Sequence, residues 1–229
     1  MFNLKAIPQN IKAALSDDDF KIYAIGGDRD EVELLIMDTI GEYSLGEGIG
    51  ATQVADFLSA NKDKPVNVRL NSPGGLAFDG VAIYSALSAH PQQVTATVEG
   101  LAFSAASIVA MGADTVRMFE ASKFGIHRSM GVAVGNAKAA RGLAEWLDQL
   151  DDTMVEIYQA KTGATKDQIG EWMDGTVDGT LFSAAEAVEA GFADEVIPLK
   201  KKPAADKMAA HSRYAAELRQ KRLRARLTR

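Results

Sequence analysis

The chain has 229 residues, of which 47% are hydrophobic and 24% charged, a balance typical of a soluble globular protein. It contains no cysteine, which excludes disulfides, thiolate metal sites and a cysteine nucleophile. No apolar run approaches the roughly 20 residues that cross a bilayer, and the first residues lack the apolar core of a signal peptide, so we expect a cytoplasmic protein.

The charge is unevenly distributed along the chain. Residues 200–229 hold 11 basic and 2 acidic side chains, whereas the rest of the chain holds 14 basic and 29 acidic ones and the net charge is −6. An acidic body with a basic tail predicts two units, a main domain over 1–198 and a tail over 199–229.

Hydrophobic periodicity predicts alternating strands and helices after an irregular, polar region over 1–30. In chain order we expect a strand at 32–37, a helix at 52–60, a strand at 66–70, a helix at 78–89, strands at 94–98 and 115–119, a long helix at 136–161, short helices starting at Thr165 and Ser183, and a last strand at 196–197. This alternation predicts an α/β fold with a largely parallel sheet, in which ligands bind at the carboxyl ends of the strands.

Two motifs follow expected strands and so lie at such ends. Ser104, in Gly100-Leu-Ala-Phe-Ser-Ala-Ala106, opens a helical run of small residues, where a serine is either a helix cap or a nucleophile. Asn71-Ser-Pro-Gly-Gly75 is a good turn, and its glycines also allow close approach of a substrate or an amide donor for an oxyanion. Ser107, one helical turn after Ser104, is expected to point away from the strand end.

Few residues are candidates for the base and the acid that a nucleophilic Ser104 needs. His127 ends a short apolar stretch and is better placed to act as a general base than His90 or His211, although a purely structural role is the ordinary alternative. Asp178 and Asp174 compete as the acid. No phosphate-binding loop, zinc site or dinucleotide fingerprint is found, so we expect no metal and no cofactor.

Taken together, these segments resemble the Clp protease proteolytic subunit family, in particular its prophage-encoded head-maturation branch. The residues that carry the resemblance are 70–75, 100–106, 125–127 and 181–194, within a region from about 20 to 198. The order of the two central motifs and the 29-residue separation of Gly75 and Ser104 make the match specific. The resemblance implies a crotonase-like α/β spiral fold built from ββα units, with a protruding handle helix at about 136–161.

The resemblance also implies a serine peptidase site. Ser104 would be the nucleophile, His127 the base, Asp178 the residue that orients the imidazole, and the backbone amides of Gly75 and Ala105 the oxyanion hole.

The acid departs from the family pattern. The family aspartate usually stands four residues before the serine that starts the last helix, here Ser183, and that position holds Gly179 with Asp178 one residue earlier. Three arrangements remain open. The loop shifts by one residue and Asp178 is the acid, Asp174 is the acid instead, or a serine–histidine dyad works without an acid.

In the family, two heptameric rings stack through the handle helix. Trp146, Leu150, Met154 and Tyr158 form a stripe that is either this seam or a cover over the helix's own domain. The resemblance therefore implies a homo-oligomer, with protein or peptide substrates and no membrane partner.

The expected function is an ATP-independent serine endopeptidase that cleaves phage capsid or scaffold proteins during head maturation. The alternatives are a non-catalytic structural subunit with this fold, a crotonase-type acyl-CoA enzyme, and a serine–lysine peptidase with Lys123 as base. The basic tail is a solvated extension, a helix that docks on capsid or scaffold protein, or a nucleic-acid contact made through charge alone. With Tyr214 as its one aromatic residue, the tail offers no support for specific nucleic-acid binding.

Overall fold

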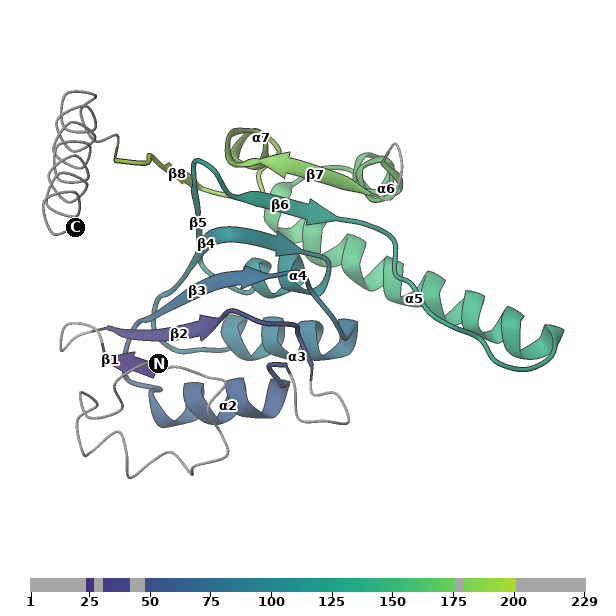
Figure 1. The fold of residues 1–229 in the computed structure, drawn as a ribbon, viewed down its shortest axis with the longest axis horizontal. Coiled ribbons are helices and arrows are strands. Elements are labelled where there is room, and N and C mark those ends of the chain that lie inside the picture. The colour runs from purple at the N-terminus through teal and green to yellow at the C-terminus, as the bar shows by residue number, and fades with distance from the viewer. Residues whose placement is uncertain (1–23, 27–30, 42–47, 176–178, 201–229) are drawn as a thin grey trace, which may run out of the picture. The chain divides into compact units, whose positions relative to one another are not determined.

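The computed structural model describes residues 24–26, 31–41, 48–175 and 179–200 (Figure 1). The chain divides into two compact units, 1–197 and 198–229, and the elements below belong to the first. They are β1 (Ala24–Gly26), β2 (Val32–Ile36), α2 (Ala51–Ala60), β3 (Val66–Ser72), α3 (Ala77–Ser88), β4 (Val94–Phe103), α4 (Ala105–Met111), β5 (Thr115–Phe119), β6 (Lys123–Ile126), α5 (Ala137–Thr162), α6 (Lys166–Asp174), β7 (Thr180–Ser183), α7 (Ala184–Glu189) and β8 (Glu195–Ile197).

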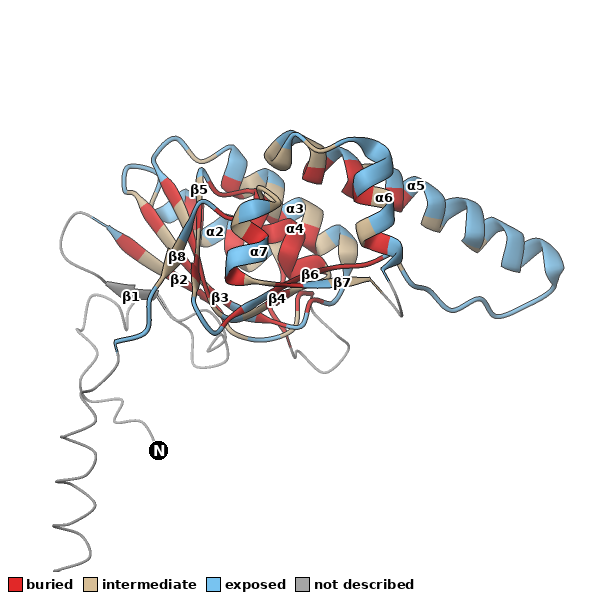
Figure 2. Ribbon diagram, turned by 90° about the horizontal axis from the view of Figure 1, so that it is seen from above, coloured by how far each residue is buried: buried red, intermediate tan, exposed pale blue. Residues whose placement is uncertain are grey.

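The strands within the described residues form one sheet, in the order β1-β2-β3-β4-β5-β8, with β6 paired to β4 and β7 paired to β6. All neighbours are parallel except β1 with β2 and β7 with β6. The predicted α/β fold with a largely parallel sheet is therefore confirmed. Helices α2, α3 and α4 lie on one face of the sheet, and this face holds the buried core (Figure 2).

Four strands, β1, β4, β6 and β7, depart from the sequence expectations. β1 lies inside the region expected to be irregular, because it adds an antiparallel partner to the free edge of β2. β4 was expected to end at Val98 but continues to Phe103. Its first half pairs with β5 and its second half with β6, so the polar Glu99-Gly100 step marks a change of partner. β6 and β7 were missed because each has only four residues, too short a pattern to be identified.

The two central motifs interlock where β3 and β4 run side by side. Between Leu70 and Ser72 the register of the pair shifts, and the Asn71 side chain fills the gap by accepting a hydrogen bond from the Leu101 amide at 3.1 Å. A β carbon at Gly100 would lie only 2.6 Å from Asn71 Oδ1, so a side chain at position 100 would displace this oxygen from its hydrogen bond. Asn71 and Gly100 thus fix the offset between the turn that follows β3 and the end of β4.

Helix α5 begins at Asn136, whose side chain accepts hydrogen bonds from the amides of Lys138 and Ala139. One face of its second half is buried, whereas most of residues 137–149 are exposed (Figure 2). Leu150, Met154 and Tyr158, candidates for an intermolecular seam, are 4%, 3% and 0% exposed and pack in their own domain. That part of the stripe cannot be a seam. Trp146 is exposed.

No helix within the described ranges is both long enough and apolar enough to cross a membrane.

The start of α7 shows the capping pattern expected from the sequence. Ser183 Oγ accepts from the Glu186 amide at 3.3 Å, and Glu186 Oε2 accepts from the Ser183 amide at 2.7 Å. These bonds satisfy two backbone amide groups, one of them at the start of α7, at the junction of β7 with the helix.

We predict that Ser183→Ala lowers the free energy of unfolding by about 1 kcal/mol, because the cap hydroxyl is lost. For a domain of this size that is a fall of about 2–4 °C in Tm, measurable by thermal or urea denaturation. Ser183→Thr keeps the hydroxyl and should remain close to wild type. Equal losses in both variants would contradict the capping role.

Candidate active site

Ser104 joins β4 to α4 in an unusual backbone conformation. Its φ of 57° and ψ of −128° make it the one non-glycine residue with positive φ within the described part of the chain. Such a conformation costs about 1–3 kcal/mol and persists only where surrounding contacts impose it. The residue occupies the N-cap position of α4, yet its side chain makes no capping hydrogen bond. The hydroxyl is therefore not used as a helix cap.

Hydrogen bonds hold the Ser104 backbone on both sides. The Ser104 amide donates to the Gly125 carbonyl of β6 at 3.0 Å. The Ser104 carbonyl accepts from the Ser107 amide at 2.8 Å and from Ser107 Oγ at 2.6 Å. The bond to Gly125 ties the serine to the strand that leads, two residues later, to His127.

His127 lies at the carboxyl end of β6 and is 4% exposed. Its ring stacks on Phe103, the residue before Ser104, with centroids 4.9 Å apart and planes at 12°. Its Nδ1 atom is buried and has no hydrogen-bond partner in the described part of the chain. A buried polar nitrogen without a partner is costly, so this atom marks where an acid would act.

The glycine turn is sandwiched between Ile40 and the Ser104 segment. A β carbon at Gly75 would lie 2.1 Å from the Ile40 carbonyl oxygen, and one at Gly74 would lie 2.6 Å from Ser104 Cβ and 2.9 Å from the Ala105 nitrogen. Their φ values of 94° (Gly74) and 152° (Gly75) lie in the range that favours glycine. Only residues without side chains allow this approach.

Two amides near Ser104 are left without a partner among the described residues. Ile40 bonds the Gly74 carbonyl and the Leu76 amide on either side of Gly75, but not the Gly75 amide itself. The Ala105 amide opens α4, where the first N–H groups of a helix have no intrahelical acceptor.

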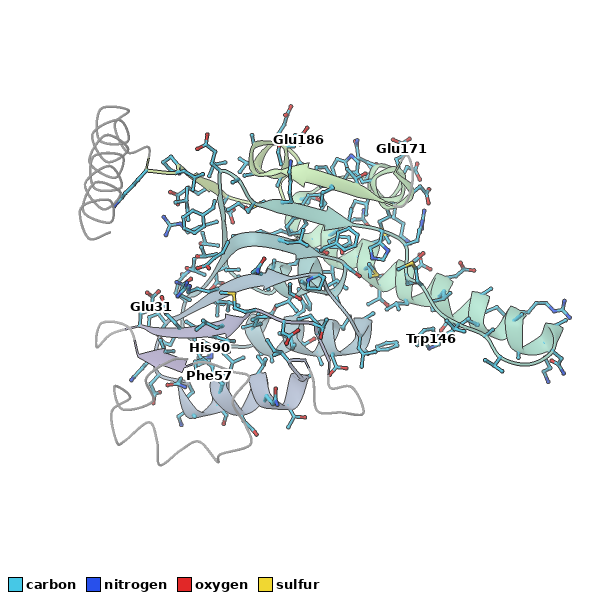
Figure 3. All side chains as sticks on the ribbon, viewed as in Figure 1. Glu31, Phe57, His90, Trp146, Glu171 and Glu186 are labelled. Atoms are coloured by element: carbon cyan, nitrogen blue, oxygen red, sulfur yellow. The ribbon has the colours of Figure 1, made fainter. Side chains whose placement is uncertain are left out.

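Ser104, His127, Gly75 and Ala105 line one cavity of about 290 Å³. The structure therefore brings these four predicted site residues together. The rest of the lining is mostly apolar and comes from α3, α4, α5 and the segment after His127: Leu76, Ala77, Phe78, Ile108, Met130, Trp146, Leu150 and Met154. Trp146, labelled on α5 in Figure 3, contacts Phe78 of α3 with ring centroids 5.3 Å apart.

A larger cavity, of about 540 Å³, lies among α6, β7 and α7. It contains none of the predicted catalytic residues, so its size gives no reason to move the site there.

The competing acids and bases occupy different positions. Asp178 lies outside the described residues. Asp174 is exposed and pairs with Arg128 through two hydrogen bonds of 2.8 and 3.2 Å, which lower the pKa of its carboxyl group. Lys123 is exposed at the start of β6 and does not line the cavity of Ser104.

The chain returns to His127 at Gly179. A β carbon at Gly179, which has a φ of 90°, would lie 2.5 Å from His127 Cβ and 2.2 Å from the Ile126 carbonyl oxygen. Asp178 is the residue directly before this contact.

Sequence reasoning missed two polar groups behind Ser104. Ser107 Oγ lies 2.8 Å from the hydroxyl of Tyr158 of α5, and both residues are fully buried. Tyr158 was taken as one member of an apolar stripe, and the only signal for its role was the hydroxyl it carries within that stripe.

Comparisons with known proteins agree with this geometry. Residues 46–200 match the family described as Clp protease. The ATP-dependent Clp protease proteolytic subunit 1 of Protochlamydia amoebophila is 30% identical over 172 residues, 73% of this chain and 81% of that protein. Subunit 1 of Salinibacter ruber is 29% identical over 158 residues, 67% of this chain and 66% of that protein.

The fold is also similar to a solved structure. A ClpP1 point mutant from Listeria monocytogenes superposes with a TM-score of 0.62 at 20% identity, covering 73% of this chain and 92% of that one. Since the family match spans more than half of the chain and includes Gly75, Ser104 and His127, the chain belongs to the Clp protease family, a family of serine-type peptidases.

Proposed function

We propose that this protein is a serine endopeptidase that cleaves peptide bonds through an acyl-enzyme on Ser104. The observation that carries the proposal is the single cavity lined by Ser104, His127, Gly75 and Ala105. A nucleophile, a base and two free amide donors are the parts that acyl transfer requires.

In the proposed mechanism, His127 Nε2 removes the proton from Ser104 Oγ as this oxygen attacks the carbonyl carbon of the substrate. The amides of Gly75 and Ala105 stabilise the oxyanion that forms. His127 then donates its proton to the leaving amine, and it later activates the water that hydrolyses the acyl-enzyme. No step needs a cofactor.

We propose Asp178 as the acid that orients His127. Two observations support it over Asp174. The chain contacts His127 at Gly179, the neighbour of Asp178, whereas both carboxylate oxygens of Asp174 accept hydrogen bonds from Arg128. The buried Nδ1 atom of His127, which has no hydrogen-bond partner among the described residues, is the group that such an acid would bind.

The cavity also suggests which side chain precedes the scissile bond. Leu76, Ile108, Leu150 and Met154 make its lining apolar, and its volume of about 290 Å³ suits one large aliphatic or aromatic side chain. We propose a preference for apolar residues at this position.

Assembly is proposed from the exposed half of α5 and the segment that precedes it. Met130, Val132 and Val134 are 69%, 88% and 90% exposed, and Trp146 is 43% exposed. Exposed apolar side chains gathered on one segment are typical of an interaction surface. We propose that copies of this chain associate here and form heptameric rings that stack, enclosing the active sites.

The finer biological role rests on the resemblance of the motifs to the head-maturation branch. We propose capsid or scaffold proteins as substrates, cleaved without an ATPase partner in the host cytoplasm or the procapsid. The basic segment 199–229 is a candidate for docking on such a protein.

The nucleophile is tested by covalent labelling with a fluorophosphonate, followed by intact-mass measurement. The wild type should gain one label per chain, and Ser104→Ala should gain none. His127→Ala should be labelled at least about 10²-fold more slowly than the wild type, because the base is lost. Ser129→Ala removes a second serine from the same cavity and should still be labelled. Labelling that persists in Ser104→Ala would falsify the proposal.

The acid is tested with the two candidate aspartates, Asp174 and Asp178. Asp178→Asn should lower kcat by about 10²–10⁴-fold, since an amide does not stabilise the protonated imidazole. Asp174→Asn should leave kcat within a few-fold of wild type, because Asp174 pairs with Arg128. The reverse order of the two effects would assign the role to Asp174, and two unchanged variants would indicate a dyad.

The preference for apolar residues is tested with peptides that differ only at the residue before the scissile bond. We expect kcat/KM for leucine or methionine to exceed that for aspartate or lysine by at least about 10-fold, because an apolar cavity does not solvate a charge. Equal values across the series would contradict the assignment of the cavity as the subsite.

A further inference from the structure

Two buried hydroxyl groups connect the back of the Ser104 peptide to helix α5. Ser107 Oγ lies 2.6 Å from the Ser104 carbonyl oxygen and 2.8 Å from the Tyr158 hydroxyl oxygen. Both side chains are 0% exposed, and neither lines the cavity. The two hydroxyl groups therefore contact the Ser104 peptide outside the cavity that a substrate would occupy.

The direction of these hydrogen bonds follows from the number of protons. A serine hydroxyl has one proton to donate, and a carbonyl oxygen can only accept. The Ser107 proton is therefore used on the Ser104 carbonyl, and Tyr158 must donate to Ser107 Oγ. Burial raises the pKa of the Tyr158 hydroxyl, so that it keeps the proton it donates. Tyr158 therefore donates to Ser107, and Ser107 donates to the Ser104 carbonyl.

The Ser104 carbonyl and the Ala105 amide belong to one planar peptide unit. In a trans peptide the C=O and N–H bonds point in opposite directions, and the described residues contain no cis peptide bond. The hydrogen bonds from the Ser107 amide and from Ser107 Oγ that hold the carbonyl therefore turn the Ala105 N–H to the opposite side of the peptide unit. Ala105 lines the cavity, so this N–H is free for an oxyanion.

We propose that Ser107 and Tyr158 are positioning residues that aim the Ala105 amide at the oxyanion and hold Ser104 in its strained conformation. The inference rests on the proposed serine peptidase function. It also gives α5 a direct connection to the chemistry, because Tyr158 belongs to the same helix as the exposed residues 137–149. A shift of this helix would be transmitted to the oxyanion hole through two hydrogen bonds.

The test combines Ser107→Ala, Tyr158→Phe and the double variant, with kcat, KM and Tm measured for each. Ser107→Ala removes the hydroxyl bond and leaves the Ser104 carbonyl with the bond from the amide of residue 107. It should lower kcat about 10-fold with KM unchanged, because an oxyanion donor acts mainly in the transition state. Tyr158→Phe should lower kcat less, since the Ser107 bond to Ser104 remains. Ser122→Ala is the matched control. Ser122 is equally buried and donates to the carbonyl three residues earlier at 2.8 Å, but it does not contact the site.

The double variant separates positioning from stability. Ser107→Ala alone leaves the buried Tyr158 hydroxyl without its acceptor, so its Tm should fall. Removing both hydroxyls should restore part of that Tm while kcat stays low. If kcat recovers together with Tm, or if all three variants turn over at the wild-type rate, Ser107 and Tyr158 are not positioning residues.

Failure of the inference is distinguishable from failure of the proposed function. A wild type that is labelled at Ser104, with variants of unchanged kcat, overturns the inference alone. A wild type that is never labelled at Ser104 overturns both. Should Ser107→Ala not fold, Tyr158→Phe still decides, because it removes one hydroxyl and keeps the ring that packs edge-on against Phe192.

Discussion

The left-handed backbone of Ser104 is the constraint on which the rest of the site depends. A serine after a strand would ordinarily relax into a capping conformation, with its hydroxyl bonded to the helix that follows. Here the amide is held by Gly125 and the carbonyl by Ser107, so the side chain is left free. The hydrogen bond from the Ser104 amide to Gly125 also ties the serine to the strand that ends just before His127. The contacts that impose the strained conformation therefore also hold the nucleophile beside the strand that leads to the base.

The sheet supplies the second requirement, which is the alignment of the two motifs. The first half of β4 pairs with β5 and its second half pairs with β6. This change of partner brings the end of β6, and with it His127, beside the end of β4, where Ser104 follows. The Asn71 side chain fills the register shift between β3 and β4, and a side chain at position 100 would displace its Oδ1 atom from the Leu101 amide. Together these contacts bring Gly74 against Ser104 and leave the Gly75 and Ala105 amides beside one cavity.

Sequence reasoning predicted the elements whose periodicity is strong and the residues that lie at strand ends. It placed Ser104 and Gly75 after strands and His127 at the end of a short apolar stretch, because alternation and turn chemistry are local properties. It could not decide whether Ser104 caps its helix, since the conformation of this residue depends on a hydrogen bond that its amide donates to Gly125, far along the chain. It assigned Leu150 and Met154 to a possible seam, because a helical stripe looks the same whether it faces its own core or a partner. The hydroxyl of Tyr158 was hidden in that stripe, and only its contact with Ser107 reveals it.

The most direct test of the central claim, that one cavity holds a nucleophile, a base and two amide donors, is a crystal structure of the protein after reaction with a fluorophosphonate. We predict phosphorus bonded to Ser104 Oγ, and the phosphonyl oxygen within hydrogen-bonding distance of the amides of both Gly75 and Ala105. His127 should lie beside the modified oxygen, with a carboxylate at its Nδ1 atom. Modification of another residue, or a phosphonyl oxygen that points to solvent and contacts neither amide, would contradict the account.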